Sequence, residues 1–363
     1  MKKVRDALQA ARVELKAVAG RLSNGVKLAT GAIRAPETGT TPHEVVLDVA
    51  GSRLLRYSDE SARKHSHPVL FVPSLVNRAY VLDLLPDRSV VRYLQGAGFC
   101  VYLLDWGIPG TGDRNTSLSD YADGRLGLAV DRILARDKAA PVLAGYCMGG
   151  SLAMMYAALH PEKVASLVLL ATPIDFDEAG LLRLWAKSSA FNLDAFVSSS
   201  GLVSPDVLNM AFTMLKPSWQ ARNSYSLWKY GWSQEFLRSY LAISKWVNDP
   251  VPVAGEAFRE YVQHWYRENR VMRGGLAAGG QTLDFTRITC PVLNVIAKSD
   301  HIIPPACSLA AEKVFTGSRR FENQVFPVGH IGLSVGEGSF SKVWNRITAW
   351  LAETDDGQHG GRE

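Results

Sequence analysis

The sequence predicts an α/β protein built on a mostly parallel sheet, and three observations support this class. Short apolar runs typical of strands alternate with longer stretches typical of helices. The 363 residues are 47% hydrophobic and 21% charged, which fits a globular chain with a large core. The alternation stops near Phe176 and resumes near Pro291. We therefore expect helices on both faces of the sheet and an insertion within it.

Residues 1–44 are predicted to form a basic amphipathic arm and a linker. Residues 1–34 contain eight basic and two acidic side chains, a net charge of +6, whereas the whole chain carries +5. The other 329 residues therefore sum to −1, and the body of the protein has no nucleic-acid footprint. Apolar residues recur at helical spacings along the arm: Val4, Leu8, Leu15, Val18, Leu22 and Val26.

Residues 45–176 are predicted to form the first half of the sheet. Ala50-Gly51-Ser52 joins the first two strands as a hairpin. The expected elements, in order, are strands 45–49, 53–57 and 68–72, a helix 80–94, a strand 100–104, a helix from a Ser119 cap to 135, a strand 141–145, a helix 149–159 and a strand 164–170.

Residues 177–285 are predicted to be a helical insertion rich in aromatic side chains. Two interpretations are open: a lid over an active site, or a helical subdomain with its own core. We favour the lid, because the insertion separates the candidate nucleophile from its expected partners. Residues 286–354 then complete the sheet, with strands 291–297 and 321–326 and helices 307–314 and 340–351, before a flexible tail 355–363.

The four cysteines, at positions 100, 147, 290 and 307, do not form a CxxC pair. A zinc ribbon and a disulfide scaffold are therefore not expected, and we predict no metal site. A reducing cytosol is the expected compartment.

The segment Gly145–Gly150 lies between an apolar strand and a helix, which is the context of a nucleophile elbow. Such a sharp turn exposes its central residue, here Cys147, at the edge of the sheet, and small neighbours prevent clashes. The N-terminus of the following helix favours a thiolate and an adjacent oxyanion. The alternative is a buried cysteine in a glycine-rich turn.

This arrangement predicts an α/β-hydrolase fold, in which the nucleophile is followed by an acid and then a histidine. Asp300 ends the strand that begins at Pro291, and His330 follows the last strand. We expect Cys147 as nucleophile, His330 as base and Asp300 as acid. His301 either faces the same cleft or lies elsewhere on the surface.

Stabilisation of an oxyanion requires two directed N–H groups. The amide of Met148, directly after the nucleophile, is one candidate. The loop Pro73–Arg78 is expected to supply the other, and Val76 is the candidate there. Asn77, in the same loop, and His301 are candidate substrate-binding residues.

Seven segments in this order resemble the catalytic subunit of polyhydroxyalkanoate synthases, over about residues 45–352. They are Leu75–Arg78, Leu104–Gly107, Gly145–Gly150, Thr172–Phe176, Ala254–Phe258, Asp300–Pro305 and Gly329–Gly332. The resemblance implies polymerisation of (R)-3-hydroxyacyl-CoA with release of CoA, with 3-hydroxybutyryl-CoA as the expected substrate and no cofactor. It assigns Cys147, His330 and Asp300 to the triad and the second oxyanion amide to Val76.

The resemblance is strongest to the short class III and class IV enzymes. The elbow Tyr146–Met148 and the segment Phe176–Leu181 are similar to class IV, whereas Ala254–Phe258 is similar to class III, which we favour. It implies a second, non-catalytic subunit and a cytoplasmic location at polyester granules. The basic arm is expected to bind that subunit, to bind the granule surface, or to form a solvated cap. The sequence leaves open whether the chain forms a homo-oligomer and whether Asp300 orients His330 or activates the substrate hydroxyl.

Two other functions are consistent with the same residues. A thioesterase or polyester depolymerase of this fold would use the same triad with water as acceptor. A granule-coating relative would have no activity.

Overall fold

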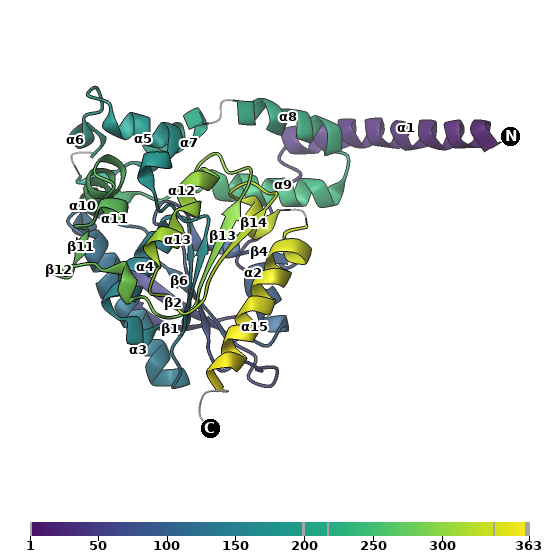
Figure 1. Cartoon of the computed structure of the whole chain (residues 1–363). Helices are drawn as coiled ribbons and strands as arrows, with labels where there is room; N and C mark the ends of the chain where they lie inside the picture. The colour runs from purple at the N-terminus through teal and green to yellow at the C-terminus, as the bar shows by residue number, and fades with distance from the viewer. Residues whose placement is uncertain (1, 198–199, 216–217, 337, 360–363) are drawn as a thin grey trace.

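The computed structural model describes residues 2–197, 200–215, 218–336 and 338–359. Its centre is an eight-stranded sheet with the order β1-β2-β6-β3-β7-β8-β13-β14, in which β1–β2 and β2–β6 pair antiparallel and the rest parallel (Figure 1). These strands are β1 Glu44–Val49, β2 Ser52–Tyr57, β3 Val69–Val72, β6 Val101–Asp105, β7 Val142–Tyr146, β8 Ser166–Leu170, β13 Val292–Ala297 and β14 Phe321–Phe326. The predicted mostly parallel sheet is confirmed.

The α-helices are α1 Lys2–Ala29, α2 Val90–Gly96, α3 Leu126–Asp137, α4 Met148–Leu159, α5 Gly180–Lys187, α6 Leu193–Phe196, α7 Pro205–Leu215, α8 Ser218–Tyr230, α9 Gln234–Val247, α10 Gly255–Glu260, α11 Arg270–Arg273, α12 Pro305–Leu309, α13 Ala311–Val314, α14 Gly332–Val335 and α15 Asn345–His359. Short π-helices η3 Asp120–Arg125, η6 Tyr261–Arg267 and η8 Phe340–Trp344 adjoin α3, α10 and α15. Two-residue or three-residue strands form the pairs β4 Asp83–Leu85 with β5 Arg88–Ser89, β9 Leu202–Val203 with β10 Val253–Ala254, and β11 Ala277–Ala278 with β12 Gln281–Thr282.

The strand period of two divides the core into two layers. In β3, Leu70 and Val72 face a cluster that contains α3, α4, α12 and α13, whereas Val69 and Phe71 face a cluster that contains α2, α14 and α15. Both faces of the sheet are therefore covered, and the central strands are buried along their whole length. This burial fixes the edge at which the loops after the parallel strands converge.

The predicted helix over 80–94 is only partly right. A 3₁₀ turn and the β4–β5 hairpin occupy its first half, and α2 begins only at Val90. The buried Asp83 carboxylate accepts hydrogen bonds from Thr41 and Ser89, and Pro86 interrupts any helix at the hairpin turn. The predicted Ser119 cap is wrong, because its hydroxyl accepts from the Gly279 amide instead.

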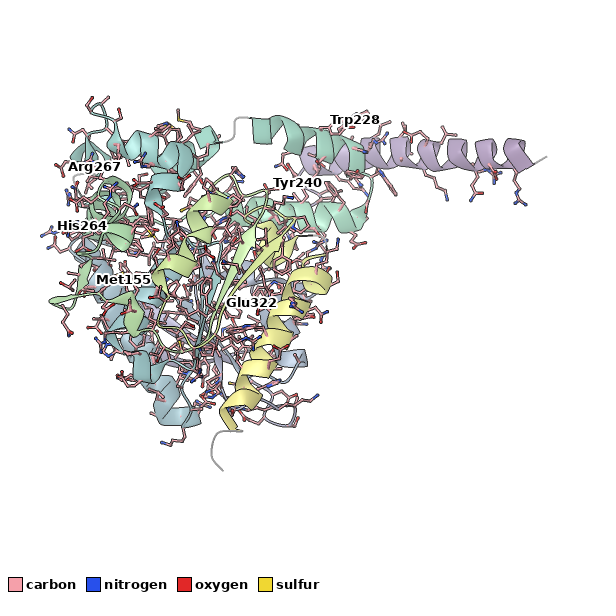
Figure 2. The ribbon with its side chains drawn as sticks, viewed as in Figure 1. Met155, Trp228, Tyr240, His264, Arg267 and Glu322 are labelled. Carbon is pink, nitrogen blue, oxygen red and sulfur yellow. The ribbon has the colours of Figure 1, made fainter. Side chains whose placement is uncertain are left out.

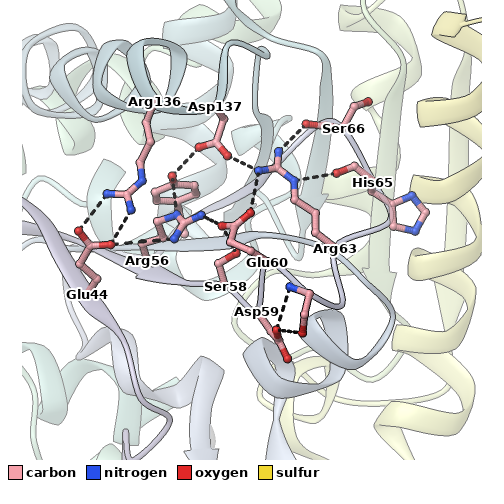
Figure 3. A network of polar contacts seen from close by, with 12 residues as sticks. Glu44, Arg56, Ser58, Asp59, Glu60, Arg63, His65, Ser66, Arg136 and Asp137 are labelled. Atoms are coloured by element: carbon pink, nitrogen blue, oxygen red, sulfur yellow. Dashed lines mark hydrogen bonds and ion pairs between the residues drawn. The ribbon is translucent and has the colours of Figure 1, made fainter.

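Polar contacts fasten the antiparallel end of the sheet to α3 (Figure 3). Asp137, whose side chain is 1% exposed, accepts from Arg63 and from the Tyr102 hydroxyl, both at 2.5 Å. Arg136 makes two hydrogen bonds to Glu44 at the start of β1. These contacts involve none of the predicted site residues, and we assign them a structural role.

The chain between β8 and β13 forms a helical cap over one end of the sheet, with His264 and Arg267 on its η6 helix (Figure 2). The cap packs in two ways. Ala257, Tyr261 and Trp265 belong to the main core, whereas Val203, Leu208 and Val253 form a small separate cluster. One part of the cap is therefore anchored on the sheet, and another part is supported by its own contacts.

The described part of the chain begins and ends in a helix. The N-terminal part of α1 extends well beyond the body of the protein (Figure 1). At the other end, α15 continues to His359, and the buried Asp355 accepts hydrogen bonds from Ser66 and His67. The helix thus extends into the tail predicted for 355–363, whose last four residues lie outside the described part. None of the described helices combines the length and apolarity needed to cross a membrane.

Candidate active site

Cys147 lies in a sharp turn between β7 and α4. Its backbone has φ 55° and ψ −123°, a conformation that non-glycine residues rarely adopt. The Cys147 amide donates to the Leu170 carbonyl at 2.8 Å, and the Cys147 carbonyl accepts from the Gly150 amide at 2.9 Å. The surrounding structure therefore maintains the turn, and the thiol is partly exposed.

Three glycines make this turn sterically feasible. A Cβ added to Gly145 would lie 2.4 Å from the Gly150 Cα, and one added to Gly149 would lie 2.0 Å from the Val72 carbonyl oxygen. One added to Gly150 would lie 1.9 Å from the Thr172 hydroxyl. The close packing of α4 against the ends of β3 and β8 thus excludes any side chain here.

Asp300 and His330 meet at the same edge of the sheet, in the loops after β13 and β14. The Nδ1 atom of His330 lies 2.6 Å from Asp300 Oδ2. The other carboxylate oxygen accepts from the amides of Ile302 and Ile303, at 2.8 and 2.9 Å. Both side chains are buried. The carboxylate is thus held by its own loop, and it fixes the orientation of the imidazole.

The surroundings of His330 favour its charged form. Burial opposes a buried cation, but Tyr146, Asp300 and Cys147 favour the imidazolium, and the pKa of His330 lies well above its ordinary value of 6.5. Tyr146 lies next to the elbow, stacks on the imidazole with ring centroids 5.3 Å apart, and donates from its hydroxyl to the His330 carbonyl at 3.1 Å. Tyr146 therefore links the loop that carries the thiol to the loop that carries the histidine.

Met148 directly follows Cys147 in the chain, and Val76, in the loop after β3, lines a cavity together with Cys147. Met148 is the first residue of α4, where a backbone amide has no partner within the helix. The Val76 amide makes only a long contact of 3.5 Å with the Ser74 hydroxyl, whereas its carbonyl accepts from Val251 at 3.3 Å. This second contact fixes the loop after β3 against the cap.

Two cavities meet at Cys147. The first, of about 160 Å³, is lined almost entirely by apolar side chains, many of them from the cap. Its aromatic members are Trp185, Phe191, Phe196, Phe212, Phe258, Tyr261 and Tyr266. The second, of about 100 Å³, includes His330 together with Asn77, Arg78 and Asn209. Cys147 and Val76 line both cavities, so the thiol has an apolar space on one side and a more polar space on the other.

The structure brings most of the predicted residues together. Asn77 lines the second cavity with Cys147 and His330, whereas His301 is absent from the described lining of either cavity. Two neighbours of the site carried no predicted role. Tyr146 and Arg78 both lie in segments that the sequence singled out, but only the fold reveals which groups they contact.

Comparison with known proteins agrees with this fold. The family described as alpha/beta hydrolase fold matches residues 67–337, and the family described as poly-beta-hydroxybutyrate polymerase (PhaC) N-terminus matches residues 21–94. The poly(3-hydroxyalkanoate) polymerase subunit PhaC of Allochromatium vinosum is 36% identical over 322 residues, which cover 87% of this chain and 90% of that relative. The chain belongs to the PhaC family. The PhaC of Synechocystis is 35% identical over 325 residues, which cover 87% of this chain and 86% of its own.

Other PhaC relatives are longer than this chain. The PhaC of Haloferax mediterranei is 34% identical over 88% of this chain, but the match spans only 65% of that relative. Solved structures support the fold. A protein of Sulfolobus solfataricus described as a lipase has a TM-score of 0.56 at 15% sequence identity. An esterase of Thermogutta terrifontis has a TM-score of 0.52 at 16% sequence identity. Each match covers 86% of this chain and 99% of the other protein. The predicted α/β-hydrolase fold is confirmed.

Gly149→Ala tests the steric account of the turn. We expect the free energy of unfolding to fall by at least about 2 kcal/mol, because the new methyl group would meet two backbone carbonyl groups. This corresponds to a fall in melting temperature of about 4 °C or more. Gly124→Ala is the matched control, since nothing lies within 4 Å of a Cβ there and its melting temperature is expected to stay within about 2 °C. Equal melting temperatures for both variants would contradict this account.

The raised pKa of His330 predicts a pH-dependent contribution to stability. A group whose pKa is raised on folding stabilises the native state fully below its unfolded pKa, and this contribution disappears as the pH rises through the folded pKa. The free energy of unfolding of the wild type, relative to His330→Gln, should therefore fall between about pH 6 and about pH 9. Denaturant titrations at both values measure it. A difference that stays constant or grows with pH would show that the pKa is not raised.

Proposed function

We propose that this chain polymerises (R)-3-hydroxyacyl-CoA, most simply 3-hydroxybutyryl-CoA, into a polyester with release of CoA. The observation that carries the proposal is a thiol and an Asp300-bound imidazole lining one cavity in a member of the PhaC family. The proposed roles are Cys147 as nucleophile, His330 as base and Asp300 as the acid that orients it. Met148 and Val76 are the proposed oxyanion amides.

In the first step the thioester is transferred to the enzyme. Since Nδ1 of His330 is bound to Asp300, Nε2 is the ring nitrogen that takes the proton of Cys147, and the raised pKa of His330 favours the imidazolium that results. The sulfur attacks the carbonyl carbon of the acyl-CoA, and the two amides stabilise the oxyanion. The bond to the CoA sulfur then breaks, and CoA leaves with the proton from His330. One thioester replaces another, so this step needs no cofactor.

In the second step the polyester bond forms. The 3-hydroxyl of another acyl unit gives its proton to His330, and its oxygen attacks the acyl-Cys147 carbonyl. An ester forms, and Cys147 leaves as the thiolate and recovers its proton. The orienting role of Asp300 is favoured over direct activation of the hydroxyl, because the carboxylate is already bound to His330 and to two amides.

The two cavities support opposite positions for the two parts of the substrate. The aromatic cavity excludes water and suits an apolar acyl chain or a growing polyester. The other cavity contains Arg78, a partly exposed cation that suits a phosphate of CoA. Asn77 is a proposed contact for the pantetheine amides, and His301, which lies outside this lining, is a weaker candidate for substrate binding.

The relatives are named as subunits, and we propose that this chain also works with a second, non-catalytic subunit. Its proposed location is the polyester granule in the cytoplasm. Exposed apolar residues on α5 and α7 support this location, because these helices also line the aromatic cavity in which the product would grow. They are Leu181, Leu184, Met210 and Met214.

Cys147→Ala is expected to abolish acylation. Cys100, Cys290 and Cys307 are buried, and burial raises the pKa of Cys290 and of Cys307 to about 12, so no other thiol is placed to replace it. Cys290→Ala is the matched control and should retain acylation. The measurement is CoA release from 3-hydroxybutyryl-CoA, with mass spectrometry of the acyl-enzyme. Undiminished CoA release by Cys147→Ala would refute the proposed nucleophile, and free acid without polymer in the wild type would identify a hydrolase instead.

Arg78→Ala tests the assignment of the polar cavity. We expect KM for 3-hydroxybutyryl-CoA to rise by on the order of tenfold, because one charge-assisted contact to phosphate is lost. The N-acetylcysteamine thioester of the same acid has no nucleotide, so its kcat/KM should change by less than about twofold. Asp249→Asn removes the carboxylate that lies 3.5 Å from Arg78 and is the control for disturbance of the loop. Equal losses with both thioesters would show that Arg78 acts without contacting CoA.

A further inference from the structure

Helix α1 presents a row of large apolar side chains to solvent. Leu15, Val18, Leu22 and Val26 are 69, 42, 68 and 62% exposed. An α-helix turns by about 100° per residue, so these four side chains lie within a sector of about 80°. We call these four residues the seam. A helix normally buries such a row, so the seam lacks a partner within the described part of this chain.

The opposite face of α1 is already bound to the cap. Asn24 is 3% exposed, donates to the Gly231 carbonyl at 2.9 Å and accepts from the Gln234 amide. A Cβ on Gly20 would lie 2.9 Å from the Trp232 Cβ, so the two elements are in close contact. Trp228 of α8 lies beside α1 (Figure 2), beneath the Arg21 guanidinium. These contacts hold the helix in an orientation that leaves the seam outward.

The width of the seam favours a helical partner over a membrane or polymer surface. Leu15, Val18 and Leu22 are separated by three and then four residues, the spacing of a coiled-coil interface. In the sequence the same alternation continues backwards through Ala11, Leu8 and Val4. A helix that lies on a lipid surface presents a wider apolar face, with aromatic side chains at its border. The seam is narrow and aliphatic.

Charge decides which helix fits. Arg5, Arg12, Lys16 and Lys27 are exposed and lie along one edge of the seam by helical spacing. A second copy of the chain would place against them a helix from an arm of the same net charge, +6 over residues 1–34, which is unfavourable. An acidic helix would place glutamates or aspartates opposite them. The first turns of α1 project beyond the body, where a second helix has access (Figure 1).

We propose that α1 pairs, through the seam, with an acidic amphipathic helix of another protein, so that this chain is one half of a heteromeric coiled coil. The contact is separate from the thiol site and does not rest on the proposed catalytic function. It gives the expected non-catalytic subunit a defined surface and a defined chemistry.

The test uses two synthetic helical peptides and the full-length protein. Both peptides carry leucines at alternating spacings of three and four; one has glutamates and the other lysines at the flanking positions. Fluorescence anisotropy at low salt measures binding to the wild type and to Leu15→Ser/Leu22→Ser. We expect the acidic peptide to bind the wild type at least tenfold more tightly than the double variant, and at least tenfold more tightly than the basic peptide binds.

Leu184→Ser is the matched control, because Leu184 is also an exposed leucine, 61% accessible, but lies on α5. It should bind the acidic peptide like the wild type. Equal binding of both peptides, or equal binding to the double variant, would overturn the proposal. A mass in solution that falls only in the double variant would also overturn it, because that result would show self-pairing. So would a double variant that no longer binds phosphatidylglycerol vesicles but still binds the peptide like the wild type. Acylation of Cys147, measured in parallel, should be unchanged and separates this test from that of the catalytic proposal.

Discussion

The site depends on one sterically demanding turn, in which Cys147 holds a positive φ between β7 and α4. The turn exists only because the neighbouring glycines let α4 pack directly on the ends of β3 and β8. The parallel order of the central strands then brings the loops after β3, β13 and β14 to the same edge. A thiol, an imidazole and a carboxylate that are far apart in sequence therefore lie at the same edge of the sheet because of the topology.

Polar and apolar surroundings have different functions around this turn. The Asp300 carboxylate accepts hydrogen bonds from two amides of its own loop. It can therefore orient His330 without a basic side chain beside it. The cap adds an aromatic wall on one side of the thiol, while Arg78 and His330 line the other side. A polymerase must favour a hydroxyl over water as acceptor, and an apolar chamber next to the nucleophile is one physical means to do so.

The sequence was sufficient for the parts of the structure that depend on local patterns. Buried parallel strands are continuous apolar runs, and the strand–turn–helix around Cys147 has a specific glycine spacing, so both were predictable. The β4–β5 hairpin was not, because it depends on a buried Asp83 that bonds to distant Thr41. The contact between Tyr146 and His330 could not be predicted either, because it depends on the packed fold. The same holds for the two cavities that meet at Cys147. Similarly, periodicity predicted that α1 is amphipathic, but not that its docked face would be the one with Asn24 and Gly20.

A structure of the acyl-enzyme would test the central claim most directly. Butyryl-CoA has no 3-hydroxyl group, so it is expected to acylate the thiol without extending a chain. The account predicts a thioester on Cys147, its carbonyl oxygen about 3 Å from the Met148 amide, and its propyl chain in the aromatic cavity. A butyryl group attached elsewhere, or a chain lying beside Arg78 and Asn209, would contradict it.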